Sequence, residues 1–335
     1  MKTEIFPNIF KIRIPLPHSP LKHINSYLIR AEEGSLLIDT GLNFPESLKV
    51  LWEALSEAGV LARAQLEKIL LTHFHVDHVG LIPRIKEVFD DVELLLHPTE
   101  VELSKLMLED SGSYKQDIED FLVAHGAPLS IAQRLQDFHP AFSAPEAYKE
   151  LVCAASPIDD GQEIMVGNYR FQALWTPGHS PGHTCLYEPS KRAFFSGDHL
   201  LPTITSHVSQ FMEDMDPLTD YLNSLKKIKK LNVEVVLPAH EEVFRNYLVR
   251  ITQLEVHHKR RLEEIVIKLE EARLTAYMLA SRLQWDISYE SWNQFPPFQK
   301  YLAFGEALAH LKILERRRLV QKVEVDDIIF YERTR

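Results

Sequence analysis

The sequence predicts an α/β domain followed by a smaller module of helices and short strands. Up to about residue 245, short apolar runs of strand type alternate with segments in which apolar residues recur at helical spacing. After that point a long helical pattern takes over, and two short, charged strand-like runs close the sequence. A length of 335 residues also fits two domains better than one. The predicted fold class is therefore layered α/β with an appended α+β module.

Strands and helices alternate in the first hundred residues. Gly59 marks the end of the first helical pattern, because glycine is common just past a helix C-terminus. The order of strand, helix and strand that follows is typical of a layered sheet covered by helices. The predicted strands cover residues 10–16, 24–30, 34–41, 66–72 and 92–98, and the predicted helices cover residues 45–59 and 80–89.

Between residues 99 and 150 the pattern changes to successive amphipathic helical pieces with few strand signals. We interpret this stretch as a helical insert that lies over one face of the sheet and acts as a lid that limits substrate size. Strand patterns resume within residues 163–180, 183–198 and 233–240. Hairpin turns are expected at Gly167–Asn168 and Pro189–Arg192.

Residues 249–335 are expected to form a separate C-terminal module, and residues 1–248 the main domain. Two helical patterns, a third one and two short strands follow in an order that resembles a winged-helix module. From Ile251 to Arg335 there are 14 Lys and Arg against 13 Asp and Glu, while the other 250 residues carry 23 against 35. Nucleic-acid-binding domains usually have a larger basic excess, so nucleic acid is a disfavoured partner. The module could instead pack on the main domain or form a homodimer contact.

The composition is that of an ordinary globular protein, with 45% apolar residues, 25% charged residues and a net charge of −11. No apolar run approaches the ~18 residues of a membrane span, and the first residues lack the apolar stretch of a signal peptide. We therefore expect a cytoplasmic protein without a membrane partner. Cys153 and Cys185 lie far apart in the sequence, and both are expected to be reduced core residues.

The stretch ILLTHFHVDHVG, residues 69–80, carries four metal-capable side chains within six positions, namely His73, His75, Asp77 and His78. A His-x-His turn after a strand places two imidazoles on one side of a loop, and the Asp-His pair can face a second position. Imidazole and carboxylate ligands suit zinc, manganese or iron, and the absence of nearby thiolates argues against a structural zinc site. The sequence therefore predicts a metal centre at the end of this strand.

Further ligands are expected downstream, because four ligands do not complete two metal positions. Candidates follow three later strands, each beside a Pro or Gly. They are His179 in TPGHS, Asp198 in FSGDH and His240 in LPAHE. Loops that follow separate strands can bring such side chains together at one edge of a sheet.

The ordered motifs LLIDTG, THFHVDH, TPGHS, SGD and LPAH resemble those of the metallo-β-lactamase superfamily, and most closely those of its glyoxalase-II-like branch. The resemblance covers roughly residues 10–245. It implies an αββα sandwich, a catalytic role for the main domain, and two divalent ions at one edge of the sheets, with zinc favoured over iron or manganese. It implies His73, His75 and His179 as ligands of one ion, Asp77, His78 and His240 as ligands of the other, and Asp198 as the bridging ligand.

The same resemblance implies supporting roles for nearby residues. Asp39 matches a position under the metal loop, where a carboxylate would orient a ligand histidine. His183 and His199 fall outside the ligand positions and are expected either to contact the ligands from outside or to be structural. In GDHLLPTITSHV and the residues after it, His207 and Phe211 are candidates for the substrate pocket.

The activity implied by the resemblance is hydrolysis. Two divalent ions would hold a bridging hydroxide and polarise the substrate oxygen, so that no Ser or Cys nucleophile is needed. Asp77 and Asp198 are the expected catalytic carboxylates, and Asp77 would also orient the hydroxide. A small ester, thioester or lactone is the favoured substrate. The alternatives are a ribonuclease or phosphodiesterase whose winged-helix-like tail holds nucleic acid, and a persulfide dioxygenase with one iron.

Overall fold

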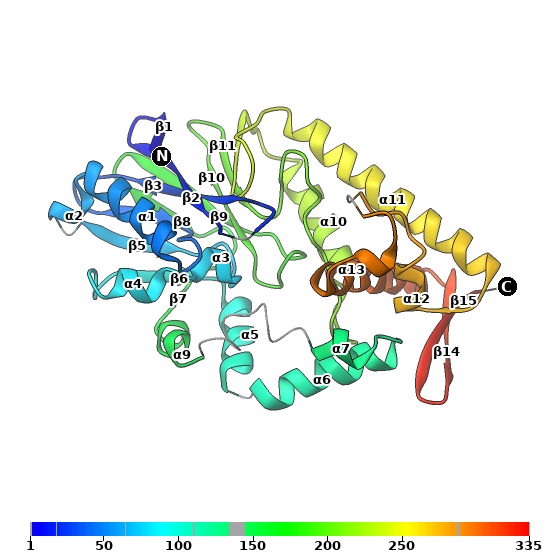
Figure 1. Cartoon of the computed structure of the whole chain (residues 1–335). Helices are drawn as coiled ribbons and strands as arrows, with labels where there is room; N and C mark the ends of the chain where they lie inside the picture. Colours follow the sequence, from blue (N-terminus) through cyan, green and yellow to red (C-terminus); the bar gives the residue numbers. More distant parts are fainter. Residues whose placement is uncertain are drawn as a thin grey trace.

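The computed structural model of the chain describes residues 2–17, 19–63, 65–109, 111–133, 145–286 and 289–334. Two sheets lie face to face with helices on their outer sides, and the C-terminal elements lie at one end of this sandwich (Figure 1). The expected αββα architecture with an appended α+β part is confirmed.

The first sheet contains strands β1 to β7 in sequence order. β1 to β4 pair antiparallel, whereas β4 to β7 pair parallel. β1 is an edge strand that the sequence analysis does not predict. The strands are β1 (Lys2–Phe6), β2 (Ile9–Pro15), β3 (His23–Ile29), β4 (Ser35–Ile38), β5 (Leu66–Leu70), β6 (Glu93–Leu96) and β7 (Ser156–Pro157).

The second sheet has the order β12-β11-β10-β9-β8, and only the β11–β12 pair is parallel. Both expected hairpin turns are present, at residues 167–168 between β8 and β9 and at residues 189–192 between β10 and β11. The strands are β8 (Glu163–Val166), β9 (Tyr169–Trp175), β10 (Thr184–Glu188), β11 (Ala193–Gly197) and β12 (Val235–Pro238).

Apolar residues on both faces of the central strands explain the layered packing. In β4, Leu36 and Ile38 belong to the apolar cluster between the two sheets, while Leu37 belongs to the cluster under the helices. Strands of this kind suit parallel pairing, which requires cover on both faces. Between the sheets, the rings of Tyr27 and Phe195 meet edge to face with 5.2 Å between centroids.

The helices of the main domain include the predicted first helix, which ends before Gly59, and the predicted insert. Most of the last predicted helix of the insert, residues 130–139, lies outside the described residues. Within the described residues, no helix is both long enough and apolar enough to cross a membrane. The helices are α1 (Pro45–Glu57), α2 (Val60–Arg63), α3 (Val76–Val79), α4 (Ile82–Lys86), α5 (Pro98–Glu109), α6 (Ser111–Ala124), α7 (Leu129–Ala132), α9 (Pro145–Cys153) and α10 (Pro217–Ile228).

The two cysteines differ in environment, although both are free thiols. Cys185 in β10 is buried, as expected. The prediction that Cys153 lies in the core is wrong, because this residue is exposed at the last position of helix α9.

The C-terminal elements start with α11 at Tyr247 and include a three-stranded sheet of order β13-β15-β14. Eleven of the 20 residues of α13 are buried, and the helix packs against α7, α10, α11 and α12. The elements are α11 (Tyr247–Glu271), β13 (Leu274–Thr275), α12 (Ala276–Ala280), η2 (Trp292–Gln294), α13 (Pro297–Arg316), β14 (Val320–Val325) and β15 (Ile328–Arg333).

The helical insert contacts the C-terminal module as well as the main domain. The rings of His125 and Tyr331 stack with 6.0 Å between centroids, and the Tyr277 amide donates a hydrogen bond to the His125 carbonyl at 3.3 Å. In Figure 1 the insert helices α5, α6 and α7 lie along one side of the molecule, between the end of the first sheet and α13. The insert therefore connects the main domain to the module.

Candidate metal centre

The four metal-capable residues of the THFHVDH motif lie just after the end of strand β5. The carbonyl of His75 accepts hydrogen bonds from the amides of His78 and Val79, which starts the one-turn helix α3. Asp77 and His78 lie on this helix, whereas His73 and His75 lie in the loop before it. The local fold thus separates the motif into two pairs of ligands.

The three downstream candidates come from the second sheet. His179 lies in the connection between β9 and β10, Asp198 directly follows β11, and His240 follows β12. Gly197 adopts a φ of 50°, and a Cβ at this position would lie 2.7 Å from His183 Nε2. Glycine is therefore required here for the chain to turn and carry Asp198 toward the loops of the first sheet.

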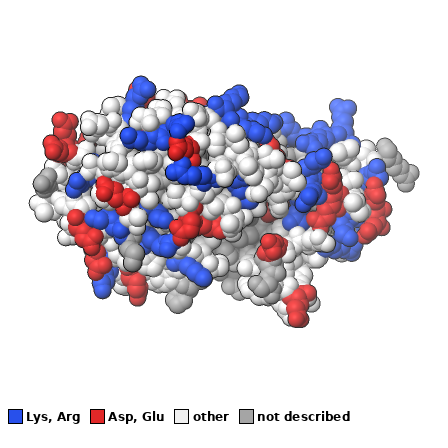
Figure 2. Space-filling view, turned by 90° about the horizontal axis from the view of Figure 1, so that it is seen from above, with Lys and Arg blue, Asp and Glu red and all other residues white. Residues whose placement is uncertain are grey.

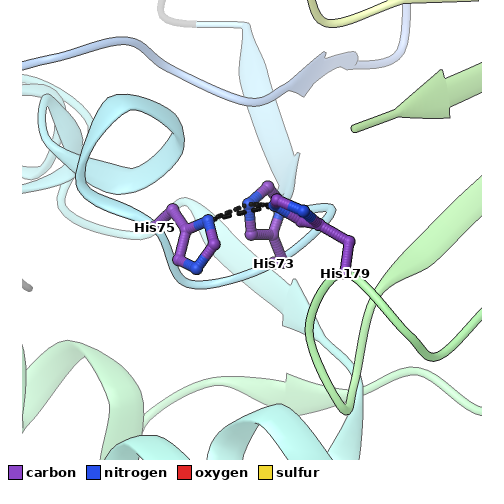
Figure 3. A group of neighbouring side chains, drawn as sticks. All are labelled: His73, His75 and His179. Carbon is purple, nitrogen blue, oxygen red and sulfur yellow. Dashed lines mark hydrogen bonds between the residues drawn. The ribbon is translucent and has the colours of Figure 1, made fainter. Parts of the chain in front are cut away.

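His73, His75 and His179 form the first group (Figure 3). His73 Nε2 lies 2.8 Å from His75 Nδ1, and His179 Nε2 lies 3.2 Å from the first atom and 3.1 Å from the second. Metal–nitrogen bonds of ~2.0–2.1 Å in a tetrahedral zinc site separate the ligand atoms by roughly 3.4 Å. The three nitrogens thus converge at nearly the spacing that one divalent ion requires.

Asp77, His78 and His240 form the second group. His240 Nε2 lies 3.4 Å from Asp77 Oδ2, and His78 Nε2 lies 3.9 Å from Asp77 Oδ1. The two imidazoles meet edge to face, with 5.7 Å between ring centroids. The group is open on one side, since the Asp77 side chain is 22% exposed while the two imidazoles are almost fully buried.

Asp198 lies between the two groups. Its Oδ2 atom is 3.5 Å from His179 Nε2, whereas its Oδ1 atom is 3.6 Å from His78 Nε2 and 3.3 Å from His240 Nε2. One carboxylate oxygen faces each group. This is the placement that a ligand shared between two ions would need.

Three buried polar atoms of this centre lack a partner in the protein and could be satisfied by a cation. Asp198 Oδ1, His78 Nε2 and His240 Nε2 have no hydrogen-bond partner among the described residues. Leaving a buried polar atom unpaired costs about 1–3 kcal/mol, and a coordinated ion would remove that cost. Nitrogen and carboxylate donors without thiolate suit zinc, iron or manganese. The residues present therefore fit a divalent metal.

The protonation states of these groups also favour metal binding. Burial lowers the pKa of both His73 and His179, so the two imidazoles are neutral near pH 7, which is the form that ligates metals. Burial alone would raise the pKa of Asp77, but the neighbouring His78 and His240 lower it to about 2. Asp77 is therefore an ionised carboxylate across the physiological pH range.

Asp39 lies beneath the loop and contacts a candidate ligand directly. Its carboxylate accepts hydrogen bonds from the Thr72 amide at 2.9 Å and from His78 Nδ1 at 2.8 Å. Burial alone would lower the pKa of His78, but the carboxylates of Asp39, Asp198 and Asp77 raise it well above its ordinary value. This excess of negative charge would stabilise a metal cation in the same way as it stabilises the proton.

Glu100 is a supporting residue that the sequence analysis does not identify. This buried carboxylate at the start of α5 accepts hydrogen bonds from the Phe74 amide at 3.0 Å, the Ser180 hydroxyl at 3.1 Å and the Gly182 amide at 2.7 Å. Phe74 lies between two candidate ligands, and Ser180 follows a third. A Cβ on Gly182 would lie 2.6 Å from Glu100 Cβ, so glycine permits this approach. The sequence signal available is an acidic residue in HPTE, directly after a buried strand.

The two other histidines near the motifs are buried, and neither belongs to the groups of candidate ligands. His183 Nδ1 lies 2.9 Å from Thr176 Oγ1, and its Nε2 accepts a hydrogen bond from the Asp198 amide at 3.2 Å. The ring of His199 packs on Tyr221 with 4.9 Å between centroids. Both placements agree with structural roles.

The two candidate pocket residues lie on the segment that follows β11. The carbonyl of His207 accepts a hydrogen bond from His179 Nδ1 at 2.8 Å, and its imidazole pairs with the Ser209 hydroxyl. Phe211 stacks on Tyr301 of α13 with 4.6 Å between ring centroids. Their contact with substrate stays a prediction, whereas the contact of His207 with a ligand histidine is a role that the sequence does not reveal.

Comparisons with known proteins agree with this fold. Solved structures of a metallo-beta-lactamase family protein from Thermus thermophilus and of a beta-lactamase domain protein from Burkholderia ambifaria both give TM-scores of 0.78. The first is 25% identical to this chain, and the match covers 98% of this chain and 100% of the other. The second is 27% identical, and the match covers 99% of this chain and 95% of the other.

Sequence comparison gives the same family. The probable metallo-hydrolase YqjP from Bacillus subtilis (strain 168) is 25% identical over 340 residues, which cover 99% of each chain. An atrochrysone carboxyl ACP thioesterase from Aspergillus fumigatus is 25% identical over 248 residues, which cover 74% of this chain and 59% of the relative. The family model of the metallo-beta-lactamase superfamily matches residues 20–240. This chain therefore belongs to the metallo-β-lactamase superfamily.

Proposed function

We propose that this protein is a dinuclear metal-dependent hydrolase that cleaves a small thioester, ester or lactone. The observation that carries the proposal is the position of Asp198, with one carboxylate oxygen toward His179 of the first group and the other toward His78 and His240 of the second. A site for a single ion would need only one of the two groups of ligands. A relative named as a metallo-hydrolase, of nearly equal length, supports hydrolysis.

The proposed reaction uses water as the nucleophile. When bound, two divalent ions supply an activated water near neutral pH and polarise the substrate oxygen. Asp77, ionised because its pKa is about 2 and partly exposed, accepts a hydrogen bond from the attacking water and orients it. A new C–O bond forms at the carbonyl carbon and the C–S or C–O bond to the leaving group breaks. One proton of the water goes to the leaving sulfur or oxygen and the other to solvent, so the products are a carboxylate and a thiol or alcohol.

Neither cysteine is placed as a competing nucleophile. Burial raises the pKa of the Cys185 thiol to about 12, so it stays protonated and unreactive at neutral pH. Cys153 is exposed at the last position of α9 and belongs to none of the three groups of candidate metal ligands. The proposed hydrolysis therefore depends on the carboxylates and imidazoles of the metal centre.

Two observations support a small substrate rather than a polynucleotide. Several relatives are named as ACP thioesterases, which favours a thioester. In addition, α13, the third helix of the winged-helix-like order, is enclosed by α7, α10 and α11 and so does not present a free face to a nucleic-acid groove. At the C-terminal end of the face in Figure 2, basic side chains lie beside acidic ones.

Metal content followed by a substrate panel tests the proposal. Purified protein should carry two divalent ions per chain and hydrolyse a short-chain acyl thioester faster than a phosphodiester or RNA. Asp198→Asn should lose at least about 100-fold in activity, since changing groups that merely contact ligands costs 10–100-fold. Asp91→Asn, at an exposed position, is the matched control and should retain full activity. One iron per chain, or cleavage of RNA alone, would contradict the proposal.

A further inference from the structure

We infer that the C-terminal module positions the metal ligand His179, and that Gly305 of α13 is the residue that makes this possible. The inference rests on the proposed metal centre. The link between them is the backbone of residues 206–212, hereafter the 206–212 loop, which touches His179 on one side and α13 on the other.

The first contact of this loop sets the orientation of the ligand. His179 Nδ1 donates a hydrogen bond to the carbonyl of His207 at 2.8 Å. Because a carbonyl can only accept, the proton is on Nδ1, and Nε2 is the atom with a free lone pair. Nε2 is also the atom that faces His73, His75 and Asp198. A movement of this carbonyl would therefore turn or release the imidazole.

The second contact ties the same loop to α13. The Gln210 amide donates a hydrogen bond to the carbonyl of Gly305 at 3.1 Å. One residue further on, the ring of Phe211 lies parallel to that of Tyr301, with an interplanar angle of 14°. A backbone hydrogen bond and a stacked ring pair thus hold the loop against one turn of the helix.

Gly305 is the residue at which α13 approaches the 206–212 loop most closely. A Cβ at this position would lie 2.6 Å from Ser209 Cβ and 2.8 Å from Phe211 Cε1, and it would also overlap the Ser209 hydroxyl. Carbon atoms without a bond between them pack at about 3.5–4.0 Å. Glycine is otherwise unfavourable inside a helix, so its presence here is explained by the close packing of the loop.

Polar contacts and ion pairs attach the next part of the chain to α13 and to the neighbouring strand β14. Lys312 Nζ donates a hydrogen bond to the carbonyl of Glu213 at 2.7 Å, and Lys322 Nζ lies 2.6 Å from the Glu213 carboxylate. Arg316 pairs with Asp216 at the start of α10. The segment is therefore held against the module over residues 209–216, and local contacts of the main domain are not its only support.

The substitution Gly305→Ala should disturb the ligand without touching it. Relieving the overlap requires the loop or the helix to move by roughly 0.5–1 Å, whereas a productive site tolerates about 0.5 Å. His207 is two residues from Ser209, so its carbonyl would move with the loop. We expect about a tenfold weaker affinity for one of the two ions, as is usual when a group that orients a ligand histidine is lost.

The experiment is a titration of the full-length, metal-free protein with Co²⁺, read by its visible absorption spectrum and by competition with a chelating dye. Gly305→Ala should weaken one of two binding steps and alter the spectrum of that ion, while the other step keeps the wild-type value. Gly112→Ala is the matched control, because a Cβ at Gly112 meets no atom within 4 Å. The double variant Gly305→Ala/Ser209→Gly removes the overlap with Ser209 but keeps the close contact with Phe211, so it should recover part of the lost affinity.

A purely structural role for Gly305 predicts a different result. The unfolding temperature would then fall while both binding steps and the spectrum stay as in the wild type, and this outcome would overturn the inference. If Gly305→Ala does not fold, Tyr301→Leu decides the question, since it loosens Phe211 without adding atoms and should weaken the same step severalfold. A wild-type chain that binds no Co²⁺ would overturn the proposed function as well. Normal loading of the wild type with unchanged variants would overturn the inference alone.

Discussion

Replacing Glu100 by glutamine should loosen both loops that carry the first group of ligands. The wild-type carboxylate accepts from the Phe74 amide through Oε1 and from the Ser180 hydroxyl and the Gly182 amide through Oε2. A glutamine side chain has the same shape but only one acceptor oxygen. Its NH₂ group must therefore face either one or two of these donors, and the donors on that side lose their hydrogen bonds.

The cost can be worked out from these contacts. Each buried donor left without a partner costs about 1–3 kcal/mol. The substitution also has a favourable effect, because it removes a buried charge. In the wild type, burial raises the pKa of Glu100, although the hydrogen bonds from Phe74 and Gly182 lower it. The net loss of unfolding free energy should be about 2 kcal/mol. Because Phe74 lies beside His73 and Ser180 beside His179, affinity for the first ion should fall at least tenfold.

Two measurements check this prediction: urea unfolding of the metal-free chain, and dye competition for Zn²⁺. Glu102→Gln is the matched control, because Glu102 lies on the same helix and is exposed, so it should change stability by no more than about 0.5 kcal/mol. If Glu100→Gln matches this control in both measurements, the three hydrogen bonds do not hold the loops, and the reasoning is refuted.

Three further predictions concern the centre and the module. Asp39→Asn should weaken one ion 10–100-fold in dye competition, since Asp39 accepts from His78 Nδ1, and an unchanged affinity would contradict this role. Zn²⁺ at about 100 times its Kd should raise the unfolding free energy by about 3 kcal/mol in the wild type, and clearly less in Asp198→Asn. Burial lowers the pKa of His310 to about 4, from 6.5 when unfolded, so the unfolded state binds the proton first and stability falls as pH drops through this window. When urea unfolding is compared at pH 7.5, 6 and 5, the slope of His310→Gln should be smaller than that of the wild type by about 1.4 kcal/mol per pH unit. Part of the slope should remain, because burial also lowers the pKa of His125 and His207 to about 4, and equal slopes in the two proteins would rule out the role of His310.

The sandwich and the ligand candidates could be predicted because their signals are local in the sequence. Buried strands such as β5 and β12 are short apolar runs, and His73 and His240 follow them within a few residues. In a sheet, the end of a strand fixes where the next side chains lie. Convergence of the ligands then follows from strand order, which the family resemblance supplied.

The supporting contacts could not be predicted, because they join segments far apart in the sequence. Glu100 contacts Gly182 across 82 residues, and Gly305 contacts Ser209 across nearly one hundred. Nothing in the pattern near either glycine signals a close approach. The prediction that Cys153 is buried is wrong because a residue at the end of a helix can face solvent even when its side chain is apolar.

The arrangement divides two tasks between parts of the chain. Loops that follow strands of the two sheets carry the candidate ligands, whereas Glu100 of the insert and α13 of the C-terminal module contact the loops on which His75 and His179 lie. Insert and module also contact each other through His125 and Tyr331, so a change in one can be transmitted to the other. Altering the insert should therefore change the range of substrate sizes, as expected for a lid, and should change metal affinity as well. A lid that affected substrate size alone would show that Glu100 does not couple the insert to the metal centre.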